Sequence, residues 1–221
     1  MTDECQDGRV TAQDPATEPT LRSYGGEPGD ARVARRRAAL IDAALDLLGD
    51  PESGGVTVRG ICARAGLTPR YFYESFSGVD DLVGATYDGV IAEIAETALA
   101  GLAAGEDTRG KVAGAIGAIV DVVDSDRRKG RLLFTDTLRS PVVATKREDS
   151  MRLFVRLTSE SAAQVMGVRP GPETTAAAYF QVGGMGRLLA SWTAGMIDLD
   201  RDHVVEVCVR LMLPGGAANE R

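Results

Sequence analysis

The 221-residue sequence has little histidine, cysteine and lysine, and it has no long apolar run. His203 is the single histidine, which argues against multi-histidine metal sites and histidine-based catalysis. The cysteines Cys5, Cys62 and Cys208 are an odd, scattered set, which indicates a reducing cytoplasm rather than a disulfide framework. We expect Cys62 and Cys208 to be buried as small apolar residues. No run approaches the roughly 20 apolar residues that cross a bilayer, and no secretory signal is recognisable, so we expect no membrane partner.

The net charge of −7 is unevenly distributed along the chain. Residues 1–30 contain two arginines and seven acidic residues, and residues 80–221 contain sixteen basic and twenty acidic residues. Residues 31–79 contain seven arginines against five acidic residues and are the only one of the three stretches with a net positive charge. Binding of a polyanion should therefore be confined to residues 31–79. Residues 1–30 have few apolar residues and several turn formers, which predicts a flexible acidic arm.

Apolar residues recur at three- and four-residue steps along most of the chain, and no stretch keeps a β-alternation. The sequence therefore predicts an all-α protein. Glycine and proline mark the ends of the helical segments, as at Gly49–Asp50–Pro51. The expected helices span about 32–48, 58–65, 69–76, 80–104, 107–125, 127–139, 142–167, 173–197 and 200–213.

Residues 57–76 combine two short helices with a tight turn. Thr57 and Thr68 stand at the two N-cap positions, where we expect their hydroxyls to cap the helices, and Gly66 ends the first helix. Such a pair is the pattern of a helix-turn-helix, in which the second helix enters the major groove of DNA with its N-terminal residues first.

Aromatic residues are concentrated in the second of these helices. Four of the eleven aromatic residues lie between positions 71 and 76. Phe72 and Phe76 are four residues apart, so both point to one side and hold the helix against a core. Such anchoring is more than a surface hairpin needs.

The outer side of this helix offers groups that suit DNA. The amides at its start, with the Thr68 hydroxyl, suit a phosphate. Arg70 fits guanine O6 and N7 or a phosphate, and Tyr71 fits a thymine methyl or the backbone. The alternative for Arg70 and Tyr71 is an ordinary solvated surface. The candidate DNA-binding residues are Thr57, Arg59, Thr68, Pro69, Arg70, Tyr71 and Tyr73.

The segment from Arg36 to Leu82 resembles the helix-turn-helix of the TetR family of transcriptional repressors. Two positions depart from that pattern. Cys62 replaces the usual alanine, and Val79 stands where the family commonly has a phosphate-binding lysine, so one backbone contact is expected to be missing. The positions that match in order and spacing are Thr57, Ile61, Ala65-Gly66, Thr68, Phe72-Tyr73-Glu74-Ser75-Phe76 and Asp80.

The resemblance implies a three-helix DNA-binding head at residues 31–79 and a larger helical body at residues 80–221. In such proteins the body binds a small molecule and dimerises through its last two long helices, here about 173–197 and 200–213. The body's aromatic and methionine residues favour a mostly apolar effector. For each candidate, ordinary core or surface is the alternative. The candidate effector-binding residues are Tyr87, Phe134, Arg139, Met151, Phe154, Tyr179 and Trp192.

The sequence itself supports a dimer through residues 173–197. An apolar stripe there runs beside a stripe of small residues, along which a second helix can approach closely. The alternative is packing within one subunit. The apolar stripe consists of Val182, Met185, Leu189, Trp192 and Met196, and the small-residue stripe of Gly183, Gly186, Ala190 and Ala194.

We therefore expect a ligand-responsive repressor that binds a palindromic operator as a homodimer and is released by its effector. The alternative is a helical small-molecule-binding or catalytic protein whose head no longer binds DNA specifically, which Val79 favours. No phosphate loop, nucleophile elbow or carboxylate–histidine arrangement is present, so we expect no enzymatic activity, cofactor or metal. Three lysines beside many arginines, alanines and glycines indicate a GC-rich genome and hence a bacterial, cytoplasmic protein.

Overall fold

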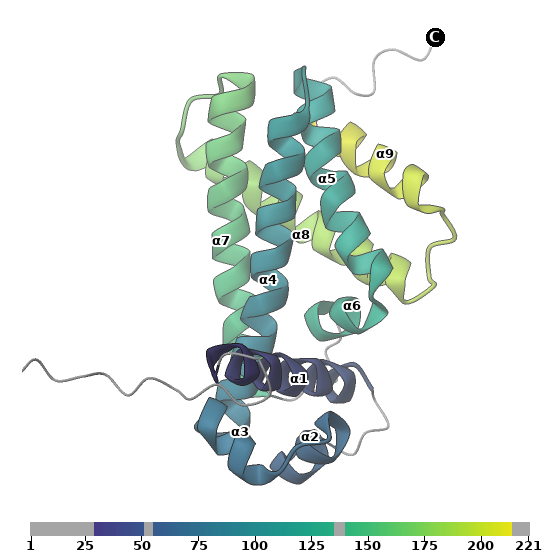
Figure 1. Ribbon diagram of the computed structural model, residues 1–221. Helices are drawn as coiled ribbons and strands as arrows, with labels where there is room; N and C mark the ends of the chain where they lie inside the picture. The colour runs from purple at the N-terminus through teal and green to yellow at the C-terminus, as the bar shows by residue number, and fades with distance from the viewer. Residues whose placement is uncertain (1–28, 51–54, 135–139, 214–221) are drawn as a thin grey trace, which may run out of the picture.

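The computed structural model describes residues 29–50, 55–134 and 140–213, and these residues form nine helices and no strand (Figure 1). The expected all-α architecture is confirmed. Nearly all of the expected acidic arm lies outside the described residues. The helices are α1 (Gly29–Gly49), α2 (Val58–Ala65), α3 (Pro69–Ser75), α4 (Val79–Ala104), α5 (Thr108–Ser125), α6 (Arg127–Phe134), α7 (Pro141–Met166), α8 (Pro172–Thr193) and α9 (Arg201–Met212).

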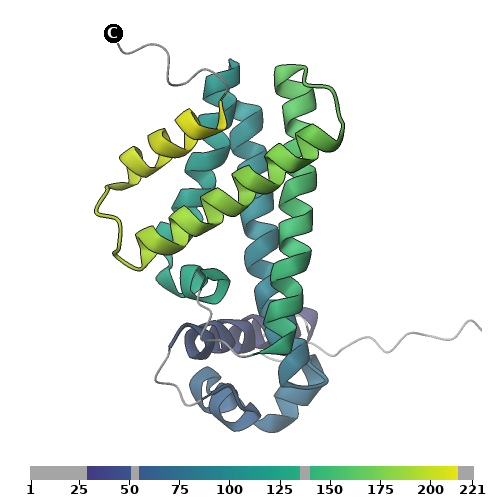
Figure 2. The same cartoon turned by 180° about the vertical axis from the view of Figure 1, so that it is seen from behind.

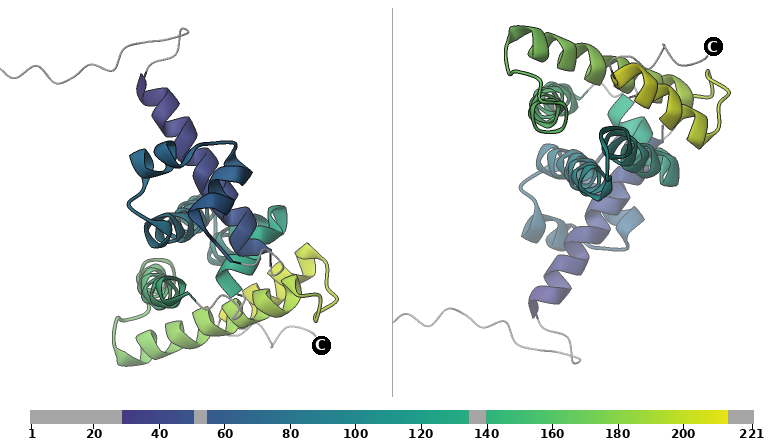
Figure 3. Two further views of the ribbon diagram at one scale, coloured as in Figure 1. Left: turned by 90° about the horizontal axis from the view of Figure 1, so that it is seen from below. Right: turned by 90° about the horizontal axis from the view of Figure 1, so that it is seen from above.

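The helices form a small lower group and a larger upper one. The long helices α4, α5 and α7 run along the upper group, and α1 lies across the lower end of α4 and below α6, with α2 and α3 beneath it (Figure 1). Seen from behind, α8 crosses the bundle diagonally, with α9 following beside it (Figure 2). Viewed along the bundle, α1 begins on the side opposite α8 (Figure 3). We call α1–α3 the head and α4–α9 the body.

One apolar core joins the head to the lower part of the body. Leu40, Ile61 and Phe72 are fully buried in it, and it continues along α4 through Leu82 to Ile94. A second core lies between α5, α8 and α9, and a small third one between α7 and α8. The head is thus packed on the foot of α4 rather than attached by a linker.

A cluster of charged side chains also connects the head to the body. Arg128 of α6 donates to Asp42 of α1 at 3.0 Å, to Asp126 at 2.8 Å, and to Asp46 of α1. Arg64 of α2 donates to Asp46 at 2.7 Å. The hydrogen bond from Arg128 holds the pKa of Asp46 and that of Asp126 below the usual value of an aspartate. We call Arg128, Asp42, Asp46 and Asp126 the Arg128 cluster.

The upper ends of α4 and α5 approach each other backbone to backbone. A Cβ placed on Gly101 would lie 2.3 Å from the carbonyl oxygen of Gly114, and one on Gly114 would lie 2.3 Å from that of Gly101. No side chain fits between these two segments, so only glycine at both positions permits the contact.

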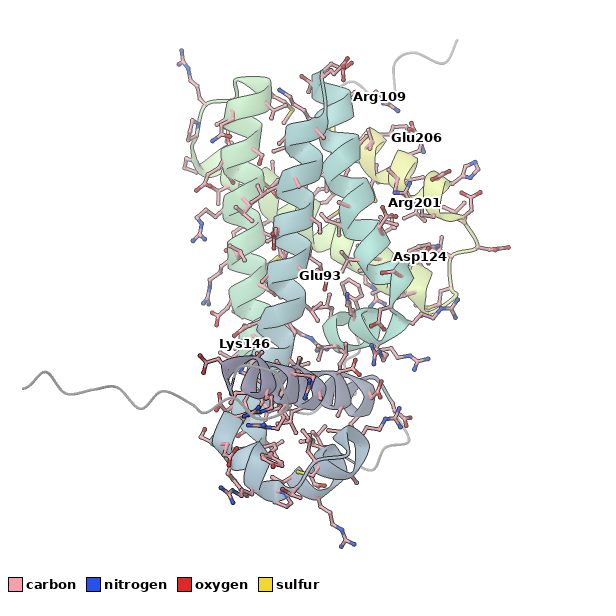
Figure 4. The ribbon with its side chains drawn as sticks, in the orientation of Figure 1. Glu93, Arg109, Asp124, Lys146, Arg201 and Glu206 are labelled. Carbon is pink, nitrogen blue, oxygen red and sulfur yellow. The ribbon has the colours of Figure 1, made fainter. Side chains whose placement is uncertain are left out.

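Ion pairs tie α9 to α5 on the outside of the body. Arg109 donates to Glu206 at 2.6 Å, and both residues are labelled in Figure 4. Arg201 donates to Asp121 at 2.8 Å. The second core runs beneath them and includes Cys208, which is buried as expected. Burial raises the pKa of the Cys208 thiol and that of the buried Cys62 thiol. No described helix combines the length and the apolar character needed to cross a membrane.

The largest difference from the expected helix boundaries is at the end of α8. The helix expected over 173–197 ends at Thr193, because Gly195 adopts a left-handed conformation with φ of +73°. The amide of Gly195 donates to Trp192 and that of Met196 donates to Ser191, which is the pattern of a Schellman turn. The helix expected over 127–139 is described only as far as Phe134.

Candidate functional site

The α2–turn–α3 unit has the local bonding that its sequence predicts. The Thr57 hydroxyl accepts a hydrogen bond of 3.1 Å from the amide of Gly60, so Thr57 caps α2 as expected. Gly66 ends α2 with φ of +65°, and the next amide, that of Leu67, donates to Cys62 at 2.9 Å. These bonds fix the turn, and hence the direction in which α3 leaves it.

The expected cap at Thr68 is wrong in one respect. Thr68 occupies the N-cap position of α3, but its hydroxyl makes no side-chain cap bond. Its carbonyl accepts from the amide of Tyr71 at 3.0 Å, and Pro69 at the first helical position has no amide hydrogen to offer. The Thr68 side chain is exposed at the start of α3.

Two phenylalanine rings hold α3 against the head. Phe72 is fully buried and Phe76 nearly so, with their ring centroids 6.1 Å apart. The Arg37 guanidinium lies 4.8 Å from the Phe76 ring centroid and closes that side of the core. Because the inner face of α3 is fixed in this way, its outer face is presented in a defined orientation.

All seven candidate DNA-binding residues are exposed. The Arg70 side chain is 84% exposed and Tyr73 is 62% exposed, whereas their neighbour Phe72 is fully buried. The structure therefore leaves all seven side chains accessible. Thr57 and Arg59 lie at the start of α2, and Thr68, Pro69, Arg70, Tyr71 and Tyr73 lie at the start of α3 and along it.

Arg36 of α1 lies beside Tyr71 and Glu74 of α3, and it was not among the residues predicted from the sequence. Its guanidinium lies 4.5 Å from the Tyr71 ring centroid and 3.6 Å from Glu74, which also accepts from Arg70 at 3.1 Å. Arg36 thus orients Tyr71 directly and Arg70 through Glu74. The four-residue spacing of Arg70 and Glu74 could have been read from the sequence, but the approach of α1 to α3 could not.

Val79 begins α4 and is partly buried against the core of the head. The acidic first turn expected there is confirmed by Asp80 and Asp81. The Asp81 carboxylate accepts from both the amide and the hydroxyl of Ser77, and these bonds lower its pKa. They tie the end of the α3 segment to the foot of α4.

A cavity of about 310 Å³ lies in the body between α4, α5, α6, α7 and α8. Four of the candidate effector-binding residues line it, namely Tyr87, Phe134, Met151 and Phe154. Tyr179 is outside it and 47% exposed. Trp192 is also outside it, because its indole Nε1 donates to the carbonyl of Leu199 at 2.7 Å in the turn that ends α8. Arg139 lies outside the described residues.

The polar groups of this cavity come mainly from α4 and α7. The Tyr87 hydroxyl lies 3.2 Å from the Ser150 hydroxyl, and burial raises the pKa of Tyr87. Arg147 lines the same end and donates to the carbonyl of Leu132 at 3.3 Å. Arg147 and Ser150 were missed, although they precede Met151 and Phe154 at helical spacing on one face of α7.

The outer faces of α8 and α9 carry exposed apolar side chains. Phe180 is 82% exposed and Leu211 is 71% exposed. The apolar stripe expected for a dimer is partly internal, because Val182 and Leu189 are buried against the same subunit. At Gly183, Gly184 and Gly186 an added Cβ would meet nothing within 4 Å, so the small-residue stripe is open at its two glycines. The dimer through α8 and α9 stays a prediction.

Comparisons with known proteins point to one group of proteins. No family model matches the chain. The chain is 32% identical over 119 residues to the HTH-type transcriptional regulator BetI of Brucella anthropi, which covers 54% of this chain and 59% of the relative. It is also 32% identical over 81 residues to BetI of Rhizobium meliloti, covering 37% and 40%. The chain thus matches less than two thirds of the length of either relative.

The solved structures agree over nearly the whole described chain. The fatty acid degradation regulator FadR of Bacillus halodurans has a TM-score of 0.71 at 15% identity, covering 84% of this chain and 97% of that one. FadR of Bacillus subtilis in complex with stearoyl-CoA has a TM-score of 0.66 at 15% identity, covering 80% and 98%. A TetR-like transcriptional regulator of Rhodococcus sp. RHA1 has a TM-score of 0.66 at 19% identity, covering 84% and 98%. The resemblance that the sequence predicts is confirmed: the fold is that of TetR-like regulators.

Proposed function

We propose that this protein is a ligand-responsive transcriptional regulator, acting in the cytoplasm as a homodimer that represses by binding a palindromic operator. The observation that carries the proposal is the construction of α3. Phe72 and Phe76 fix its inner face in the head core, while Arg70, Tyr71 and Tyr73 are exposed on its outer face. The names of the BetI and FadR relatives support the same role.

The proposed DNA contacts follow from this geometry. The start of α3 enters the major groove, so Arg70 reaches a base edge and Thr68 reaches the adjoining phosphate. Arg70 exchanges its ion pair with Glu74 for a guanine, and Arg36 keeps Glu74 and Tyr71 in place. Thr57 and Arg59, at the start of α2, contact the backbone on the other side of the groove.

The proposed dimer pairs the outer faces of α8 and α9. Phe180 and Leu211 would be removed from water there, and the open space above Gly184 admits the helix of a second copy. Two heads that read successive major grooves on one face of DNA must lie about 34–36 Å apart, or a multiple of that distance. The dimer sets this separation.

The proposed effector binds in the cavity of about 310 Å³, which is within the size range of small-molecule sites. FadR of Bacillus subtilis, which has this fold, binds the small molecule stearoyl-CoA, which supports a small-molecule effector for the fold. An effector releases the operator only if it binds more tightly to the state in which the heads are wrongly spaced for DNA. We propose no enzymatic activity for the cavity.

The test is a binding titration with the purified protein and DNA fragments that flank its own gene. We expect one palindromic fragment to bind, with a log–log salt slope of about −0.9 for each neutralised phosphate. The same fragment with its half-sites scrambled is the control. Weak binding of equal strength to both fragments would instead support the alternative, a helical protein whose head no longer reads DNA.

A further inference from the structure

A second cavity continues the first along the body. It has a volume of about 130 Å³ and lies between α4, α5, α7 and α8, farther from the head. Ile119, Phe154 and Met185 line both cavities and form the partition between them. The flexible Met185 side chain lets such a partition open without backbone movement. We call the first cavity the lower chamber and the second the upper chamber.

Together the two chambers extend along a long part of α4. On α4 their lining extends from Tyr87 in the lower chamber to Leu102 in the upper one. Fifteen residues of α-helix correspond to about 22 Å at about 1.5 Å per residue. With C–C bonds of about 1.5 Å, an extended alkyl chain of about sixteen carbons has a similar length.

The two ends of this space differ in charge. Among the described residues, the charged side chains that line the lower chamber are Arg147 and Arg187, both cationic, and no carboxylate lines it. The described lining of the upper chamber has no charged side chain. Within the described lining, guanidinium groups therefore lie at the end near the head, and the other end has only uncharged side chains.

Nearby carboxylates are engaged on the outside of the bundle. Asp88 pairs with Lys146 at the lower end of α7, where Figure 4 labels the lysine. Glu148 and Asp149 pair with the exposed Arg152, at 3.0 and 3.3 Å. None of these three carboxylates lines a chamber.

From this arrangement we infer that the ligand of the body is a long-chain carboxylate. Its carboxylate lies at Arg147, with the Tyr87 and Ser150 hydroxyls as further hydrogen-bond donors. Its alkyl chain passes Phe154 and Met185 and ends in the upper chamber. This inference deepens the proposed function by naming the effector class, and it rests on that function only for the link between binding and release of DNA.

Calorimetry on the purified full-length protein without DNA tests the site by itself. The probes are hexadecanoate, hexadecanol and hexadecyltrimethylammonium, each below its aggregation threshold. We expect hexadecanoate to bind at least tenfold more tightly than the alcohol and the cation to bind weakest. Equal binding of the acid and the alcohol, or tightest binding of the cation, would overturn the inference.

Substitutions at the lower chamber test the head-group site. Arg147→Gln should remove the preference for acid over alcohol, whereas Arg147→Lys should keep most of it. The matched control is Arg152→Gln, on the same helix and outside both chambers. An unchanged preference in Arg147→Gln, or a lost preference in Arg152→Gln, would contradict the assignment. Hexadecanoyl-CoA, tested in parallel, should bind more weakly than the free acid, and tighter binding would assign the site to a thioester.

A substitution in the upper chamber tests the path of the chain. Ala162→Phe should weaken hexadecanoate at least tenfold and leave octanoate unchanged, because octanoate is short enough for the lower chamber. Ala144→Phe, on the exposed side of α7, is the control. Equal losses for both acids would show that the chain does not reach the upper chamber.

Adding hexadecanoate to the protein–operator complex separates this inference from the proposed function. If the acid does not bind in calorimetry while the operator still binds, the inference fails and the proposed DNA binding stands. If the acid binds as described while the ligand-free protein selects no operator, the regulator proposal fails and the ligand site stands. Release of the operator by hexadecanoate, but not by hexadecanol at the same concentration, supports both.

Discussion

The head and the body of this protein differ in how completely their interiors are filled by side chains. The head has a closed core in which Leu40, Ile61 and Phe72 are fully buried. The body encloses chambers of about 310 and 130 Å³ between its long helices. A surface that binds specific DNA bases needs side chains in fixed positions. A ligand-binding site instead needs a cavity that the bound ligand fills. The comparison indicates where the protein is rigid and where it can change.

The largest expected effect is loss of the head core. Phe72→Ala should lower the free energy of unfolding by about 3–5 kcal/mol, because it removes a fully buried ring from a closed core. Phe154→Ala should lower it by less than half as much, because Phe154 already borders two cavities. Urea denaturation at one fixed protein concentration measures both. Equal losses would show that the head is no more tightly packed than the body.

The next effect concerns operator binding rather than stability. Arg70→Ala should weaken specific binding by about 1–3 kcal/mol and relax the preference at one base position. Arg156→Ala, a body substitution of the same charge change at a residue that is also exposed, is the control. Titration of an operator series measures the change. Equal losses on operator and random DNA would make Arg70 a phosphate contact instead.

The Arg128 cluster tests how the two regions are joined. Arg128→Met should lower the free energy of unfolding by about 1–2 kcal/mol at neutral pH, since the cluster is partly exposed. The pKa values of Asp46 and Asp126 are lowered in the folded protein, so their contribution is present above the unfolded pKa of about 4 and is lost as pH falls further. Denaturation from pH 7 to pH 3 should therefore show wild type and variant converging. A constant difference would contradict this origin.

The smallest expected effect is at Val79. Val79→Lys should tighten binding to all DNA sequences alike and steepen the salt slope by about one unit for each added phosphate contact. The lysine stem can keep the apolar packing of Val79 while its ammonium reaches solvent. Salt titrations of operator and random DNA measure the slope. An unchanged slope would show that this position does not reach the backbone.

The difference between the head and the body also explains which features could be predicted from the sequence. The limits of α2, the cap at Thr57 and the exposed surface of α3 depend on residues within twenty positions of each other, so they were predictable. The chambers take their lining from five helices, and the sequence pattern does not determine which face of each helix turns inward. Of the residues expected to bind an effector, Tyr87 and Phe154 line the lower chamber. Trp192 does not line it, since the Gly195 turn brings Leu199 to its indole.

The close contact of Gly101 with Gly114 fixes one end of α4 against α5, so the rest of α4 can tilt about that contact. Because the helix backbones touch there, α4 cannot slide along α5 at that point and can only tilt about it. Val79, at the other end of α4, is about 33 Å away at about 1.5 Å per residue, and the head is packed on that end. A tilt of about 5° about the Gly101–Gly114 contact would move the head by about 3 Å. In a symmetric dimer the displacements of the two heads would add. A small adjustment of packing beside α4 is thus magnified at the surface that must match the pitch of DNA.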